Sequence, residues 1–445
     1  MSENMHRKRH LTTFQVIILG FAGVILLGAA ILMLPVSSAK GNVTSFHDAL
    51  FTATSAVCVT GLAVRDTGSY WSAFGQTVIL ILIQVGGLGV VTVASAVTIL
   101  SGKKISLMQR STMQDAISAP QVGGIVRLTR FILKGTFLIE LCGAFLLLPV
   151  FCHDYGAKGI WMAVFHSISA FCNAGFDILG TSETTFPSLT GYTGNIMVNV
   201  VIMFLIIIGG IGFLTWEDIC TNRGKLKRYR LQSKVIFATT LIFIVLPAIF
   251  FFFSDFQELS AGKRFLASLF QAITPRTAGF NTENLSNMTE VSKAVMILLM
   301  LVGGSPGSTA GGMKTTTFAV LILNAAATFR SREEVSVFGR RIDNSVIKNA
   351  ATIGMMYLIL FLCGGFIISV QNEIPLLDSL FEAASAVGTV GLTLGVTPEL
   401  HLASRYVLIA LMYLGRVGGL TLIYAVLSKK KTGNAKLPLE KITVG

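Results

Sequence analysis

The chain has 445 residues, of which 53% are hydrophobic and only 13% are charged, and its formal net charge is +13. So few charged residues cannot cover the surfaces of several soluble domains. The composition therefore predicts an integral membrane protein. The basic residues stand in short clusters between long apolar segments, which is typical of membrane topology signals and not of nucleic-acid binding.

One pattern recurs along the chain: an apolar segment, a shorter half-polar segment, a loop with a glycine, and a second long apolar segment. Segment 12–35 follows three basic residues but is longer than the core of a signal peptide, so we expect a retained membrane helix. The copies lie at 12–35, 45–58, Gly61 and 73–100; at 128–151, 159–172, Gly175 and 194–220; at 232–254, 263–274, Gly279 and 291–329; and at 345–370, 376–388, Gly391 and 402–428.

Each half-polar segment has roughly 13 residues, or about 20 Å of helix, and cannot cross a hydrocarbon core of about 30 Å. It must therefore enter the membrane and turn back, and irregular backbone at that depth requires a shared polar cavity. The predicted fold is an all-α integral membrane protein with eight transmembrane helices and four re-entrant half-helices. The expected repeats are residues 1–105, 106–224, 225–335 and 336–445, the third having a broken last helix.

The distribution of basic residues predicts the orientation. The N-terminus, the loops near 103–134, 223–234 and 330–348, and the C-terminal tail hold 25 of the 35 lysines and arginines. Because basic residues concentrate on the cytoplasmic side, we expect both termini to be cytoplasmic and the glycine loops to open outward. The six cysteines show no metal-ligand spacing, so we expect neither a zinc site nor a disulfide framework.

The four glycine loops are the candidate ion site. The helices before them end in unpaired carbonyls, which favour a cation, and glycine lets backbone carbonyls replace the hydration shell of an alkali cation. The alternative is that the glycines only allow close helix packing. The candidate ligand residues are Val59, Thr60 and Gly61; Asn173, Ala174 and Gly175; Thr277, Ala278 and Gly279; and Thr389, Val390 and Gly391.

The last segment of the third copy is interrupted where the other three look continuous. Five glycines and a proline fall within ten residues, which cannot hold a regular helix. We expect a flexible loop at membrane depth; the alternative is a static kink. The residues are Gly303, Gly304, Ser305, Pro306, Gly307, Ser308, Thr309, Ala310, Gly311 and Gly312.

These motifs resemble the Ktr/Trk/HKT superfamily, and most closely its KtrB-type potassium-translocating subunits. The resemblance covers the whole chain and rests on the four glycines, on GGSPGSTAGGMKT at 303–315 and on YLGRVGG at 413–419. It implies one pseudo-fourfold pore per chain, two chains in a homodimer, and K+ bound by the backbone carbonyls of the filter. Glycine at all four positions goes with K+ preference in this family, whereas serine in the first copy goes with sodium transport in some plant members.

The resemblance also implies that the broken segment is the gate and that Arg416, inside the last span, forms an electrostatic barrier beneath the filter. A buried ion pair of Arg416 with Glu140 is the alternative, since a charge at that depth needs a cavity or a partner. Lys314 belongs to the gate or extends to the lipid headgroups. Arg276 ties down its half-helix or tunes conductance as a mouth charge.

Each last span also carries a glycine pair, which we expect to pack closely against the filter. The pairs are Gly86–Gly87, Gly209–Gly210, Gly303–Gly304 and Gly418–Gly419.

No nucleotide-binding motif is present in the chain. The resemblance implies regulation by a cytosolic ring of KtrA-type subunits that bind ATP, ADP or NAD and dock on the basic loops near 223–234 and 330–341. Those loops could instead bind anionic lipid. The implied location is the bacterial plasma membrane, with Na+ open as a coupling or activating ion. A coupled carrier with broken helices is the second hypothesis; a membrane enzyme is disfavoured because catalytic motifs are missing.

Overall fold

The computed structural model describes residues 12–101, 105–117, 123–419 and 421. The basic N-terminal cluster and the C-terminal tail, which contribute to the predicted orientation, lie outside these residues. The regular structure of the described part consists of sixteen α-helices, five short 3-10 helices and one two-stranded hairpin. The all-α prediction is therefore confirmed.

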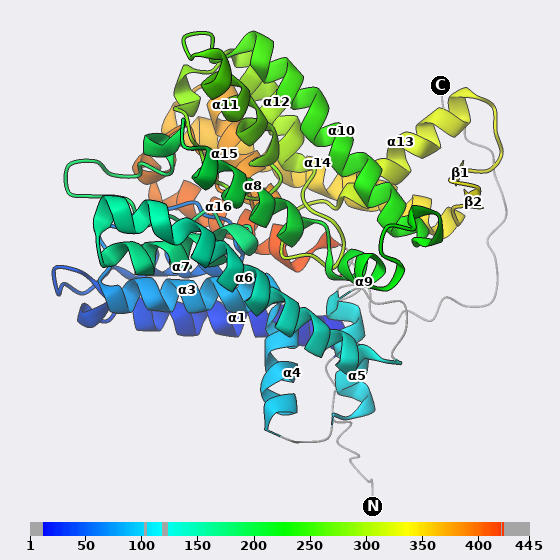
Figure 1. Ribbon diagram of the computed structural model, residues 1–445, viewed down its shortest axis with the longest axis horizontal. Coiled ribbons are helices and arrows are strands. Elements are labelled where there is room, and N and C mark those ends of the chain that lie inside the picture. Colours follow the sequence, from blue (N-terminus) through cyan, green and yellow to red (C-terminus); the bar gives the residue numbers. More distant parts are fainter. Residues whose placement is uncertain (1–11, 102–104, 118–122, 420, 422–445) are drawn as a thin grey trace, which may run out of the picture.

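The helix, half-helix, helix pattern occurs four times in the described chain (Figure 1). The first repeat contains α1 (Thr13–Leu32), α2 (Phe46–Val57), α3 (Ala73–Leu88) and α4 (Val90–Leu100); the second α6 (Ile125–Tyr155), α7 (Lys158–Phe171), α8 (Ile196–Gly210) and α9 (Phe213–Asn222); the third α10 (Leu231–Ser254), α11 (Ala261–Ile273), α12 (Glu290–Leu301) and α13 (Thr315–Phe329); the fourth α14 (Asn344–Asn372), α15 (Leu376–Gly388) and α16 (Leu402–Val417).

Several short elements are not predicted by the apolar pattern, because they lie in polar connections. They are α5 (Leu107–Ile117), the hairpin β1 (Ser336–Val337) and β2 (Arg340–Arg341), and the 3-10 helices Pro35–Ser37, Thr190–Tyr192, Leu226–Arg228, Leu285–Asn287 and Thr397–Glu399. Figure 1 shows α13 and the hairpin extending from one end of the molecule.

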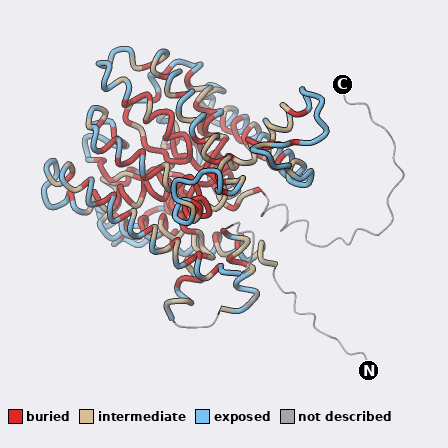
Figure 2. Tube along the Cα trace, turned by 45° about the vertical axis from the view of Figure 1, so that its right-hand side comes forward, coloured by how far each residue is buried: buried red, intermediate tan, exposed pale blue. Residues whose placement is uncertain are grey.

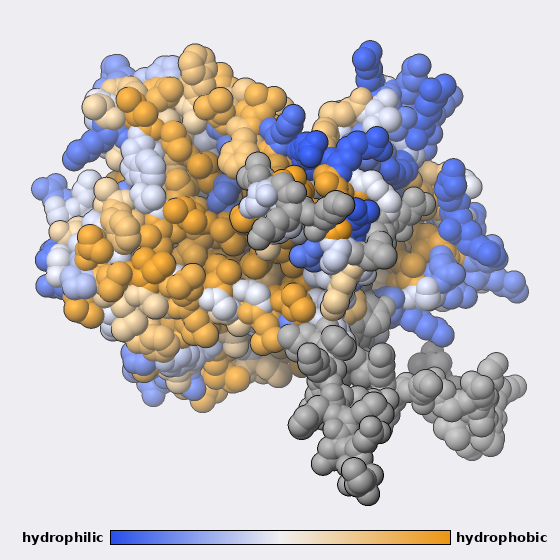
Figure 3. Space-filling view, turned by 90° about the horizontal axis from the view of Figure 1, so that it is seen from below, coloured by the Kyte–Doolittle hydropathy of each residue, from blue (hydrophilic) through white to orange (hydrophobic). Residues whose placement is uncertain are grey.

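The first helix of every repeat is long and apolar enough to cross a membrane. These helices, α1, α6, α10 and α14, have 20, 31, 24 and 29 residues. Large apolar side chains on them point outward, such as Phe145 (72% exposed) and Leu141 (69%). Figure 3 shows apolar residues filling the middle of one face between hydrophilic groups at its two ends, as expected for a surface in contact with lipid.

The repeats are arranged as a closed ring. Within each repeat the long first helix packs on its own half-helix, in the pairs α1–α2, α6–α7, α10–α11 and α14–α15. Each second helix also packs on the half-helix of the next repeat, in the pairs α3–α7, α8–α11, α12–α15 and α16–α2. The last of these contacts joins the fourth repeat to the first. Figure 2 shows that the buried residues concentrate around the centre of this ring.

The expectation that only the third repeat has a broken last helix is wrong. Helices α3 and α4 meet at 95°, and α8 and α9 meet at 96°. The bends occur at Gly89 and Gly212, and α16 ends at Gly418; all three have φ between 84° and 92°. Only glycine adopts this backbone conformation without strain, so three single glycines end the straight helices where the sequence shows unbroken hydrophobicity.

The expected glycine pairs need two corrections. Gly303 and Gly304 pack within segment 303–312, where an added Cβ would lie 2.3 Å from the carbonyl oxygen of Gly311 or from the Cβ of Ala310. The second correction concerns the fourth pair. Gly86, Gly209 and Gly415 each stand so close to the last turn of their own half-helix that an added Cβ would lie under 3.0 Å from the carbonyl oxygen of Val57, Phe171 or Val387. The fourth counterpart is therefore Gly415, and Gly418 is the residue at which α16 ends. In this register Arg416 occupies the place of the second glycine, Gly87 or Gly210.

Candidate functional site

The four glycine loops, residues 59–61, 173–175, 277–279 and 389–391, share one backbone conformation. The glycines have φ of 91°, 68°, 79° and 93°, and the residues two positions earlier, Val59, Asn173, Thr277 and Thr389, have φ of 50° to 65°. A left-handed conformation is strained for β-branched residues such as valine and threonine. Left-handed residues at the first and third positions turn successive peptide planes, so that neighbouring carbonyls can point to one side.

The loops also meet one another in cyclic order. A Cβ added to each glycine would lie within 2.7 Å of the carbonyl oxygen of the middle residue in the following loop. The pairs are Gly61 with Ala174, Gly175 with Ala278, Gly279 with Val390, and Gly391 with Thr60. The missing side chains of the glycines therefore let the four loops close around one axis, with a carbonyl at each contact.

The half-helices direct their carbonyl ends at this ring. Helices α2, α7, α11 and α15 end at Val57, Phe171, Ile273 and Gly388, immediately before the loops. Each helix end carries about half a negative charge from the aligned peptide dipoles. Four such ends converge on the ring, so the field at its centre favours a cation.

Hydroxyl groups hold the loops in two different ways. The Oγ of Ser55 accepts from the N–H of Gly61 (3.1 Å), and the Oγ of Ser385 accepts from the N–H of Gly391 (3.0 Å). In the other two loops the Oγ of Ser169 donates to the carbonyl of Phe176 (2.7 Å), and Thr274 donates to that of Phe280. These supports are not predicted by the sequence analysis, although a Ser or Thr stands five or six residues before every glycine.

The broken segment, residues 303–312, lies between α12 and α13 and is held mainly by backbone groups. The N–H of Ser305 donates to the carbonyl of Gly210 (3.0 Å), and the N–H of Phe213 donates to that of Gly307 (2.7 Å). The Nζ of Lys314 donates to the carbonyl of Ala310 (2.8 Å). Lys314 therefore folds back on the segment and does not extend to the headgroups.

Arg416 is half-buried and bonds to backbone oxygens of two repeats. Its guanidinium donates to the carbonyls of Thr309 and Gly86, and at 3.2 Å to that of Gly87. In the described part of the chain no carboxylate pairs with Arg416. The Oε2 of Glu140 accepts instead from Gln84 (3.2 Å), so the alternative of an Arg416–Glu140 ion pair is wrong for this structure.

A cavity of about 410 Å³ lies beside the broken segment. Its lining includes Ser308, Lys314 and Arg416, together with Gly89 at the bend between α3 and α4 and Gly418 at the end of α16. Residues of the broken segment and two positive side chains therefore stand together at this cavity.

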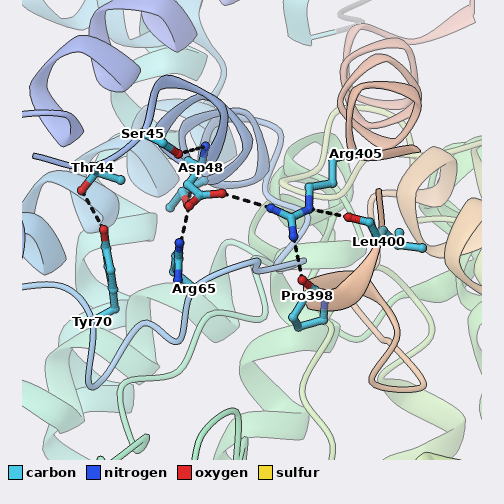
Figure 4. A network of polar contacts seen from close by, with 9 residues as sticks. Thr44, Ser45, Asp48, Arg65, Tyr70, Pro398, Leu400 and Arg405 are labelled. Atoms are coloured by element: carbon cyan, nitrogen blue, oxygen red, sulfur yellow. Dashed lines mark hydrogen bonds and ion pairs between the residues drawn. The ribbon is translucent and has the colours of Figure 1, made fainter. Parts of the chain in front are cut away.

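The ring is closed between the first and fourth repeats by an ionic network (Figure 4). Buried Asp48, on α2, accepts from the Nε of Arg65 (2.9 Å) and from the Nη1 of Arg405 (3.1 Å) on α16. Lys293 and Asp378 form a weaker pair, at 4.0 Å, in the same register between repeats three and four. In both pairs the acid stands 13 residues before the loop glycine of its own repeat, and the base stands 14 residues after the loop glycine of the preceding repeat in the ring. This shared spacing is a sequence signal that could have predicted both pairs.

Arg276 is buried below the third loop, and its Nη2 donates to the Oγ1 of Thr240 on α10 (3.2 Å). This contact agrees with the interpretation that Arg276 ties down its half-helix. His166 is buried as well, against Phe151 and Phe280, with its Nδ1 2.8 Å from the carbonyl of Met162. His166 belongs to the scaffold behind the loops.

The cyclic fold of four helix, half-helix, helix repeats is that of a membrane cation transporter. The family model of TrkH, described as a cation transport protein, matches residues 3–435. The chain belongs to this family, which confirms the resemblance read from the glycine motifs. Members of the family are transporters, so the chain is a membrane transport protein and not an enzyme.

Individual relatives match over nearly the whole chain. The chain is 39% identical to Ktr system potassium uptake protein B of Bacillus subtilis, covering 97% of this chain and 96% of the relative. It is 38% identical to potassium/sodium uptake protein NtpJ of Enterococcus hirae, with 98% of each covered. Among solved structures, the potassium transporter TrkH of Vibrio parahaemolyticus matches with a TM-score of 0.74 at 19% identity, covering 96% of this chain and 87% of the other.

Proposed function

We propose that the protein takes up K+ through a filter formed by the backbone carbonyls of residues 59–61, 173–175, 277–279 and 389–391. The observation that carries this proposal is the cyclic contact of the four glycines, each against a carbonyl of the next loop. Carbonyl rings of this kind replace the hydration shell of an alkali cation. The names of the two sequence relatives, both potassium uptake proteins, support K+ as the transported ion.

The broken segment at 303–312, with Lys314 and Arg416, is the gate of this pore. Support comes from its contacts: the segment lines the cavity and lies against Thr389 of the fourth loop, and backbone hydrogen bonds and Arg416 hold it there. Its five glycines allow it to adopt a second conformation at low cost. A static kink would not need the guanidinium of Arg416 bonded to the carbonyl of Thr309, in the middle of the segment.

The transporter works in a bacterial plasma membrane, with both termini in the cytoplasm and repeats divided near residues 105, 224 and 335. Two chains form a homodimer, and a cytosolic ring of nucleotide-binding subunits activates the pore. The name "Ktr system" of one relative supports a multi-component arrangement. The basic connections at 223–234 and 330–341 are the docking surface for that ring, and anionic lipid is the competing ligand.

Sodium is the second candidate ion, because one relative is named a potassium/sodium uptake protein. Na+ would act as a coupling or activating ion alongside K+. Uptake of K+ by proteoliposomes in the presence and absence of Na+ separates this role from passive K+ flux.

The test is growth of a potassium-uptake-deficient bacterium that expresses this chain, with and without its soluble subunit. Growth at low external K+ is expected, and replacement of Gly61 by serine should reduce it. If the membrane-inserted chain does not restore growth at any K+ concentration where the parent strain fails, K+ uptake is refuted.

A further inference from the structure

Thr309 connects the broken segment to the second glycine loop through its side chain. Its Oγ1 lies 3.1 Å from the Oδ1 of Asn173 and 3.1 Å from the carbonyl oxygen of Phe171. Both neighbours are acceptors, so the single hydroxyl proton of Thr309 is shared between them. Thr309 and Asn173 are both 0% exposed, which means that no water can take over this bond while the segment stays in place.

The orientation of the Asn173 amide follows from its other contacts. Its Nδ2 donates to the carbonyl of Arg276 (3.2 Å) and lies 3.5 Å from the Oγ1 of Thr277. The amide oxygen must therefore face Thr309. Asn173 is the only amide at the first position of the four glycine loops, so one side chain links the second loop, the third loop and the broken segment.

The backbone of Thr309 is held as well. Its carbonyl accepts from Arg416, and its N–H donates to the carbonyl of Gly209 at 3.3 Å. Moving the segment out of the path breaks these bonds and leaves the amide oxygen of Asn173 without its donor. A buried acceptor that loses its partner is costly, so the side chain and its loop must readjust.

We propose that Thr309 and Asn173 form a latch that couples the position of the broken segment to the geometry of the second and third glycine loops. Opening of the segment then changes the ion preference of the ring. Because such coupling is reciprocal, a change in the loops alters the stability of the closed segment by the same free energy. The latch rests on the proposed filter and gate and adds that the two are one coupled unit.

The test measures K+ and Na+ flux of the full chain in proteoliposomes, without soluble subunits. Thr309→Val removes the hydroxyl and keeps the shape of the side chain. Its flux should rise about fivefold, the factor for one lost hydrogen bond. The ratio of K+ to Na+ flux should fall several-fold with it. Thr309→Ser, which keeps a hydroxyl, should restore both values.

Thr129→Val is the matched control, because it makes the same change at a buried threonine on α6, outside the loops and the broken segment, whose hydroxyl donates within its own helix to the carbonyl of Ile125 (3.0 Å). We expect less than a twofold change in its flux and an unchanged ion ratio. A double variant with Asn173→Leu gives a second measurement: once Asn173 is replaced, Thr309→Val should not lower the ion ratio further.

Two results would overturn the latch. A Thr309→Val variant with raised flux and an unaltered ion ratio makes Thr309 an anchor of the segment and nothing more. A variant identical to the wild type in both values removes even that role. Either result leaves the proposed filter and gate intact, because separate experiments test them. The filter is refuted if Gly61→Ser does not affect the ion ratio, and the gate is refuted if deletion of residues 307–311 does not raise flux.

Discussion

Replacement of Gly61 by serine is the most direct perturbation of the candidate filter. An added Cβ would lie 2.5 Å from the carbonyl oxygen of Ala174 and 3.1 Å from the Cα of Gly175. Both atoms belong to the backbone of the neighbouring loop, so they cannot rotate away as a flexible side chain would. The carbonyl of Ala174 must move, and it is one of the proposed K+ ligands.

Two costs add in this variant. A non-glycine residue at the φ of Gly61, 91°, costs about 1–2 kcal/mol. Relief of the short contact costs about 1–3 kcal/mol, as overpacking does elsewhere. The second cost falls on the geometry of the ligands, so we expect the preference for K+ over Na+ to decrease by about 10- to 100-fold, equivalent to about 1.4–2.8 kcal/mol.

Gly395→Ser provides the matched control. Gly395 has a φ of 90° but no atom within 4 Å of an added Cβ, so this variant has the backbone strain without the displaced carbonyl. The assay is the K+ to Na+ flux ratio in proteoliposomes for both variants beside the wild type. Equal ratios in Gly61→Ser and wild type, or an equal decrease in Gly395→Ser, would refute the assignment of Gly61 to the filter.

Three other changes test the remaining parts of the pore. Deletion of residues 307–311 should raise flux without a soluble subunit, because the segment no longer reaches its anchors; a folded variant with unaltered flux argues against a gate. Arg416→Gln should raise conductance in single-channel or flux recordings, since it removes a charge from the path and weakens the hold on Thr309; no change would leave Arg416 a purely structural residue. Asp48→Asn should lower the free energy of unfolding by about 1–3 kcal/mol, a range that allows for the exposure of both arginine partners. Thermal unfolding in detergent measures this loss, and an unchanged midpoint would contradict a role of Asp48 in closing the ring.

The sequence by itself determined the membrane class, the fourfold repeat and the position of the candidate ligands. Segment length and hydropathy are local properties, and about 20 Å of helix cannot cross a bilayer whatever its neighbours are. The glycines at 61, 175, 279 and 391 were identifiable because the same backbone requirement recurs once in every repeat. Local patterns could not reveal the bends at Gly89 and Gly212, since a hydrophobic run continues through both.

Only the tertiary structure decided which polar groups meet. Arg416 bonds to Thr309 across 107 positions of sequence, Thr309 to Asn173 across 136, and Arg405 to Asp48 across 357. From the sequence Glu140 is the natural partner of Arg416, because both are charges inside predicted spans. The fold places Arg416 where the second glycine of the pair stands in other repeats, next to carbonyls at the end of a bent helix and in the broken segment. Those carbonyls satisfy the guanidinium without a carboxylate, because carbonyls near a helix end keep lone pairs that the helix itself does not use. The carbonyl of Gly86 accepts from Arg416 in addition to the N–H of Gly89.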